Sequence, residues 1–174
     1  MDLFGIIKTK WRDQKIKTLS DEVDQILKSL FSVDELLTTP SSFFDEPYVQ
    51  GFFTGYTMAV QDIRFDALSW TKSERGEFQI LLYRNINNGE TYGLQRMLKD
   101  LDFTRSLTNN AEFINARDEG STVAVVCHNK LKQDANEPLI ESAKKTANQI
   151  GVDLPTAILM DTIGSFKLRW TEKS

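Results

Sequence analysis

The stretch PYVQGFFTGYTMAVQDIRFD, residues 47–66, constrains the fold most, because it predicts a helix whose sides differ in chemistry. Apolar residues at intervals of three and four form one broad stripe; they are Val49, Phe52, Phe53, Tyr56, Ala59, Val60 and Ile63. The opposite stripe is polar and consists of Gln50, Thr54, Thr57, Gln61 and Arg64. Gly51 and Gly55 lie between the stripes, one turn apart. Because each glycine costs a helix roughly 1 kcal/mol relative to alanine, the pair predicts a neighbouring backbone packed closely against it.

The composition is that of one ordinary globular domain. The 174 residues include 11 phenylalanines, which is ample for a large core. A single cysteine cannot form an internal disulfide, so nothing requires an oxidising compartment and we expect a cytoplasmic location. No apolar stretch approaches the roughly 20 residues that span a bilayer, and we expect no stable membrane association.

Charge is distributed unevenly along the chain. Residues 1–18 form a basic amphipathic N-terminal segment with five basic and two acidic residues. Residues 19–66 carry nine acidic and two basic residues, whereas residues 67–174 carry 14 of each sign. An acidic surface of this kind repels phosphate backbones and attracts basic proteins, so we expect a basic protein partner and no nucleic acid. The partner-binding candidates are Asp21, Glu22, Asp24, Asp34, Glu35, Asp45 and Glu46.

Helical patterns continue to residue 120, and the character of the chain then changes. A short helix is expected from Asn110 to Arg117, closed by Gly120. After Ser121, the run TVAVVCHN, residues 122–129, has the β-branched, apolar composition of a strand covered on both faces. A helix over 137–150 follows, then a second strand at TAILMDT and a third that alternates Phe166, Leu168 and Trp170 with basic residues.

These patterns together predict an α+β fold. Residues 19–120 would form a helical region built around the 47–66 helix, and residues 121–174 a small βαβ(β) unit that shares its core.

Few residues are suited to catalysis. His128, the only histidine, together with Lys130 and Asp161 would lie at the carboxyl ends of the predicted strands, where open α/β folds bind ligands. Lys130 could hold an anion there while His128 or Asp161 moves a proton. Asp62 and Asp66 lie one turn apart and could touch a divalent cation, but two exposed carboxylates more often form a solvated surface. The chain contains no glycine-rich phosphate loop, and we expect no metal and no cofactor.

Three functions are compatible with these features. The first is a non-catalytic protein-binding module of the inhibitor, immunity or adaptor type, which uses acidic residues between 20 and 66 against a basic partner. The second is an enzyme or small-ligand binder that uses the strand-end cleft. The third is a self-assembling scaffold component in which Gly51, Gly55 and Met58 form a contact between copies of the chain.

Overall fold

The protein is helical throughout the part that the computed structural model describes, which is residues 11–22, 25, 46–65, 70–72, 74–76, 78, 107, 109–130 and 135–171. A helix covers residues 11–22. The longer elements are α4 (Pro47–Phe65), α8 (Ala111–Cys127), α9 (Glu137–Ile150) and α10 (Leu154–Thr171). The interpretable part is 87% helical and contains no strand. The prediction of an α-helical protein is therefore confirmed, and the prediction of an α+β fold with a C-terminal βαβ(β) unit is wrong.

The predicted strands are segments of two helices. Residues 121–127 form the last part of α8, and both 156–162 and 166–170 lie inside α10. In α8, Val123, Ala124, Val125 and Val126 are all buried. A helix enclosed on every side needs no polar face, so a short apolar run does not distinguish it from a buried strand. Burial in this position outweighs the β-propensity of valine.

Helix α8 begins where the sequence predicts and continues beyond the predicted end. Asn110 is its N-cap, because its side chain accepts a hydrogen bond of 3.1 Å from the backbone N–H of Phe113. Gly120 does not terminate the helix. A Cβ atom at Gly120 would lie 2.0 Å from the carbonyl oxygen of Phe52, so glycine serves here to admit the backbone of α4. The predicted boundary between residues 120 and 121 falls inside this helix.

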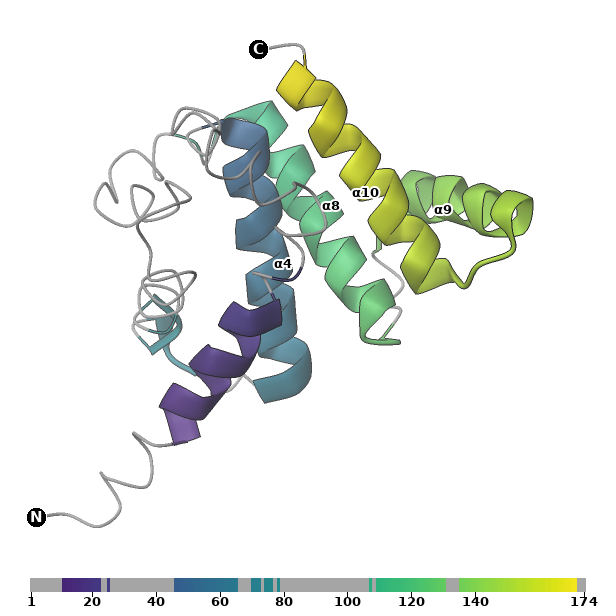
Figure 1. Ribbon diagram of the computed structural model, residues 1–174. Helices are drawn as coiled ribbons and strands as arrows, with labels where there is room; N and C mark the ends of the chain where they lie inside the picture. The colour runs from purple at the N-terminus through teal and green to yellow at the C-terminus, as the bar shows by residue number, and fades with distance from the viewer. Residues whose placement is uncertain are drawn as a thin grey trace, which may run out of the picture.

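Helices α4 and α8 are parallel and touch backbone to backbone. A Cβ atom at Gly51 would meet the carbonyl oxygen of Phe113 at 2.3 Å, and one at Gly55 would meet that of Arg117 at 1.9 Å. From Gly51 to Gly55 on α4 the contact moves from Phe113 to Arg117 on α8, so the two helices run in the same direction, as Figure 1 shows for the ribbons. The close neighbour predicted for the two glycines is confirmed, and it is α8. Gly51 and Gly55 are buried, whereas Met58 is 39% exposed.

Helix α10 runs antiparallel to this pair and closes its N-terminal end (Figure 1). The ring of Phe166 is fully buried and lies 5.4 Å from that of Tyr48 and 5.1 Å from that of Phe52, both at steep angles. One turn along, the Arg169 guanidinium lies 3.7 Å above the Tyr48 ring and donates a hydrogen bond of 2.5 Å to Glu112. The end of α10 is thereby fixed to the first turns of both α4 and α8.

Helix α9 confirms its sequence prediction at both ends. It spans Glu137–Ile150 and ends at Gly151, whose φ of 74° is the left-handed conformation that glycine adopts readily. Within the described residues, no helix combines the length and apolarity needed to cross a membrane.

Three of the five residues in the polar stripe of α4 are buried, whereas Thr54 is partly buried and Arg64 is exposed. Gln50 and Thr57 are fully buried and Gln61 is 1% exposed. The Thr57 hydroxyl donates to the carbonyl oxygen of Phe53 on its own helix, at 2.7 Å. Helix α4 is therefore covered on both faces over most of its length, as expected of the central element of the fold.

Candidate functional site

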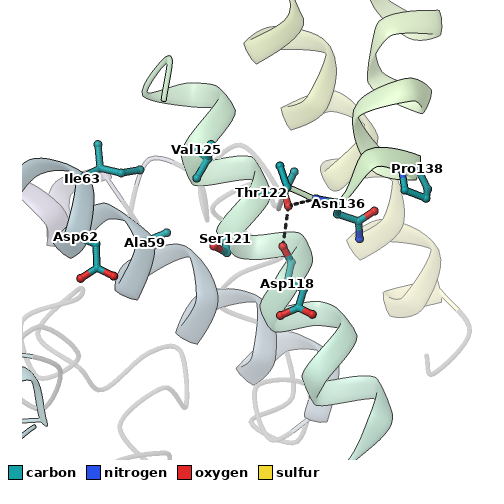
Figure 2. A pocket seen from close by; sticks show the side chains of 10 residues that line it. Ala59, Asp62, Ile63, Asp118, Ser121, Thr122, Val125, Asn136 and Pro138 are labelled. Carbon is teal, nitrogen blue, oxygen red and sulfur yellow. Dashed lines mark hydrogen bonds between the residues drawn. The ribbon is translucent and has the colours of Figure 1, made fainter. Parts of the chain in front are cut away.

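A cleft of about 430 Å³ opens between the C-terminal halves of α4 and α8 and is bounded by the start of α9 (Figure 2). It lies where the close contact of the two helices ends. On α4, Ala59 and Asp62 continue the stripe that begins at Gly51 and Gly55, since they follow at helical spacing. Past the glycines the ribbons diverge, as Figure 1 shows, and side chains rather than backbone line the space.

The lining of the cleft is half apolar and half polar. Its apolar part consists of Ala59, Ile63, Val125, Ala135 and Pro138. Its polar part consists of Asp62, Asp118, Ser121, Thr122 and Asn136. This combination suits a ligand or side chain with an aliphatic body and a polar end.

Two of the polar groups serve to hold the walls together. The Thr122 hydroxyl accepts a hydrogen bond of 2.9 Å from the backbone N–H of Asn136 and donates one of 2.9 Å to the carbonyl oxygen of Asp118. The Asn136 side chain caps α9, where it accepts from the N–H of Leu139 at 3.2 Å. The bond from Asn136 to Thr122 attaches the start of α9 to α8, and Figure 2 draws it together with the bond from Thr122 to Asp118. The polar groups that remain are Asp62, Asp118 and Ser121.

Asp62 lies opposite a cation from another segment of the chain. Its Oδ1 atom is 3.0 Å from Nη2 of Arg75, and both side chains are about one-quarter exposed. That oxygen is buried, yet the approach of Arg75 does not have the geometry of a hydrogen bond. Because that oxygen is shut off from solvent, the ion pair with Arg75 is the interaction that compensates its charge.

Asp118 is the more accessible carboxylate of the cleft. Its side chain is 60% exposed, and the guanidinium of Arg117 lies 3.5 Å from it. An exposed pair of this kind contributes little energy. Asp118 is therefore free to interact with a cation that enters the cleft from solvent.

A second polar cluster surrounds Glu22, at the end of the helix over residues 11–22. Its Oε1 atom accepts a hydrogen bond of 2.5 Å from the Tyr56 hydroxyl and lies 2.8 Å from Nε2 of His128. Its Oε2 atom accepts one of 2.6 Å from Nη1 of Arg64. One carboxylate, 21% exposed, thus joins the N-terminal helix to α4 and to the C-terminal end of α8.

Tyr56 is held as a hydrogen-bond donor in this cluster. Burial raises its pKa far above the ordinary value, and the Glu22 carboxylate raises it further. The phenol therefore stays protonated at every physiological pH. We call Glu22, Tyr56, Arg64 and His128 the Glu22 cluster.

Cys127 lies beside the Glu22 cluster and is chemically quiet. Burial, together with the carboxylates of Glu22 and Asp153, raises the pKa of its thiol from 9.0 to about 11. A protonated thiol is a poor nucleophile, so Cys127 and the adjacent His128 do not form a reactive pair. This environment is that of a structural cysteine.

Alkylation of Cys127 should be slow in the folded protein. A pKa raised by about two units leaves about 100-fold less thiolate at a given pH, so iodoacetamide should react with the native protein about 100-fold more slowly than with denatured protein. Because the folded pKa is the higher one, this contribution to stability is fully present below pH 9 and is lost as the pH rises towards 11. Labelling followed by mass spectrometry measures the ratio. Equal rates for the two states would contradict the burial of the thiol.

The residues predicted for a strand-end site do not come together. His128 caps α8 and pairs with Glu22, and Lys130 is exposed beyond it. Asp161 belongs to α10, and its side chain accepts hydrogen bonds from two residues of α9, Thr146 at 2.9 Å and Ser142 at 3.2 Å. The predicted cleft required the carboxyl ends of parallel strands, and these segments are helices. In the described part of the chain, His, Cys, Asp and Glu side chains form no group of three that could hold a metal ion.

The acidic partner-binding candidates are described only in part. Asp21 is exposed, Glu22 is directed into the Glu22 cluster and Glu46 is partly buried. Asp24, Asp34, Glu35 and Asp45 lie outside the described residues, as do residues 1–10 of the basic N-terminal segment and Asp66.

Sequence reasoning missed Asp118 and Arg75 as parts of a site. Asp118 belongs to a stretch with balanced charge, and only the packing of α8 on α4 brings it to the same cleft as Asp62.

Comparison of the chain with protein-family models, with curated proteins and with solved structures found no match.

Proposed function

We propose that the protein is a non-catalytic binding module, of the inhibitor or adaptor type, that docks on a basic surface of a protein partner. The acidic segment of residues 19–66, with nine acidic and two basic residues, supplies the long-range attraction. Complementary charge of this kind accelerates encounter and orients the partner.

The observation that carries the proposal is the α4–α8 cleft. Asp62 comes from the acidic segment, and Asp118 on α8 adds a carboxylate that this segment does not contain. The acidic surface therefore includes a concave place with apolar walls, which can take a side chain of the partner. Asp21, exposed at the end of the N-terminal helix, belongs to the same acidic segment.

Charge reversal at Asp118 tests the proposal. The full-length protein would be used to capture proteins from its native lysate at low and at moderate salt, with mass spectrometry to identify them. We expect one stoichiometric basic partner whose recovery falls as salt screens the contact. Asp118→Lys should weaken its capture by about tenfold, since it places a cation where the partner's cation would bind.

Glu141→Lys is the matched control. It makes the same change in net charge, and Glu141 is an exposed residue of α9 that does not line the cleft. We expect its capture to match that of the unmodified protein. Equal capture by all three proteins at both salts would refute the proposal.

A further inference from the structure

Three aromatic rings from separate segments of the chain surround one ammonium group. Nζ of Lys15 lies 2.9 Å from the centroid of the Trp11 ring. It lies 4.8 Å from the centroid of the Phe65 ring and 5.7 Å from that of Trp70. All three distances are within the roughly 6 Å over which a ring face attracts a cation. We call Trp11, Phe65 and Trp70 the aromatic cage.

The cage is assembled by the packing of the N-terminal helix on α4. Trp11 and Lys15 belong to the helix over residues 11–22, which lies beside α4 in Figure 1. Phe65 is the last residue of α4, and Trp70 follows it in the chain. The cage therefore exists only in the folded protein.

Two walls of the cage are held in place independently of the cation. The buried ring of Phe78 lies 5.8 Å from that of Phe65 and 5.3 Å from that of Trp70. Next to Trp70, the N–H of Thr71 donates to the Glu74 carboxylate at 2.8 Å, and the N–H of Glu74 donates to the Thr71 hydroxyl oxygen at 3.2 Å. This reciprocal capping box fixes the backbone beside the Trp70 ring. Both walls should therefore keep their positions when the ammonium leaves.

The chemistry of the cage favours a methylated ammonium over the one it holds. A lysine ammonium is compact and strongly hydrated, so replacing its water by ring faces is costly. A trimethylammonium group carries the same charge on a less hydrated surface, and its methyl groups contact ring faces directly. Lys15 reaches the cage because it follows Trp11 by four residues, which places the two side chains side by side on the helix. Its attachment gives it a high effective concentration, so it needs little intrinsic affinity to occupy the cage.

We propose that the aromatic cage is a binding site for a trimethylammonium group, and that Lys15 is the competitor that occupies it when no ligand is bound. The ligand displaces Lys15 by rotation of the flexible side-chain stem, without movement of the helix. Trp11 is 52% exposed, so the ligand approaches from solvent at this wall. None of the three rings lines the α4–α8 cleft, and this binding activity is independent of the proposed function.

Choline and its carbon isostere test the assignment on the full, unmodified chain. The isostere is a neutral alcohol that carries a tert-butyl group in place of trimethylammonium. Binding would be followed at constant ionic strength through the indole N–H signals of Trp11 and Trp70 in ¹⁵N-labelled protein. We expect choline to shift both signals and to bind about tenfold more tightly than the alcohol, because ring faces attract only the cation. Equal binding of the two compounds, or unchanged signals from both indoles, would overturn the proposal.

Lys15→Ala tests the competition. The variant removes the ammonium from the cage, so it should bind choline about tenfold more tightly than the unmodified protein. Lys17→Ala is the matched control, because it removes the same charge from an exposed residue of the same helix, and its affinity should not change. If Lys15→Ala bound choline no better than Lys17→Ala, Lys15 would not be a competitor.

Trp11→Leu, made in the Lys15→Ala background, tests the exposed wall of the cage. The change keeps an apolar side chain but removes the ring, so choline affinity should fall about tenfold. Circular dichroism would establish that this double variant is folded. Undiminished affinity in the folded double variant would show that choline binds elsewhere, which would refute the assignment.

Two lysine compounds test the need for methyl groups and distinguish the sources of the ligand. Nα-acetyl-Nε-trimethyl-lysine methylamide should bind about tenfold more tightly than the same compound without the three methyl groups. Equal affinities would contradict the preference for a methylated ammonium. Tighter binding of the trimethylated compound than of choline would support a methylated lysine of another protein as the ligand, whereas tighter binding of choline would support a small molecule of the choline type.

Discussion

Gly55→Ala should destabilise the protein by about 3 kcal/mol, although the same change in most helices is stabilising. The added Cβ atom would lie 1.9 Å from the carbonyl oxygen of Arg117 and 2.7 Å from its carbonyl carbon, both of which belong to the backbone of α8. No rotation of a side chain relieves that overlap, so α4 and α8 must move apart. Urea denaturation followed by circular dichroism measures the loss.

Gly164→Ala is the control, with an expected effect of opposite sign. Gly164 lies in α10, and a Cβ atom there would meet nothing within 4 Å. The variant should be up to about 1 kcal/mol more stable, because alanine favours the helix. If Gly55→Ala were as stable as the control, the two backbones could not be in contact.

A larger substitution at Gly55 separates two interpretations of the glycine stripe. Should Gly51, Gly55 and Met58 join copies of the chain, Gly55→Leu would release folded monomers, which light scattering would detect. The contact of Gly51 and Gly55 with α8 instead predicts unfolding of the chain itself.

Local patterns predicted the central helix and its glycine contact because the residues of α4 alone contain the signal for both. Two glycines one turn apart have a cost that only a close neighbour offsets, so the neighbour could be inferred without being identified. Gly120 shows the limit of such reasoning. A glycine near the end of a helical pattern usually terminates the helix, and only the position of Phe52 reveals that this one admits a second backbone.

The predicted strands failed because their evidence was composition without periodicity. Val123, Val125 and Val126 are buried on different sides of α8, so the run has no polar positions to reveal a period of 3.6. The error extended to the site, because His128, Lys130 and Asp161 were grouped only by the assumed strand ends.

The candidate cleft required tertiary information for a different reason. Asp62 and Asp118 are 56 positions apart, and Arg75 reaches Asp62 from a third segment. The charge count identified the acidic segment, which includes Asp62. The charge count could not show which acidic side chains are directed inward. Glu22 was counted among the partner-binding residues, but its carboxylate binds three side chains of the protein itself.

Glu22→Ala should lower the free energy of unfolding by about 2–3 kcal/mol. The change removes the shared acceptor of Tyr56, Arg64 and His128, and it leaves a buried phenol and a partly buried imidazole without their carboxylate partner. It also removes the contact with His128 that joins the end of the N-terminal helix to the C-cap of α8. Denaturation by urea measures the loss, and hydrogen exchange at the amides of residues 16–22 should become faster.

Asp21→Ala is the control for Glu22→Ala, because the neighbouring acid is exposed and should change stability by less than about 0.5 kcal/mol. Glu22→Gln should fall between the two, since its amide oxygen still accepts a hydrogen bond but carries no charge for Arg64. If Glu22→Ala behaved like Asp21→Ala, the Glu22 cluster would not stabilise the fold. Glu22 would then be available to a partner, as its place in the acidic segment first indicated. Partner capture by the two Glu22 variants would show which role holds. Substitution of a binding residue lowers capture without loss of stability, whereas substitution of a structural residue lowers both capture and stability.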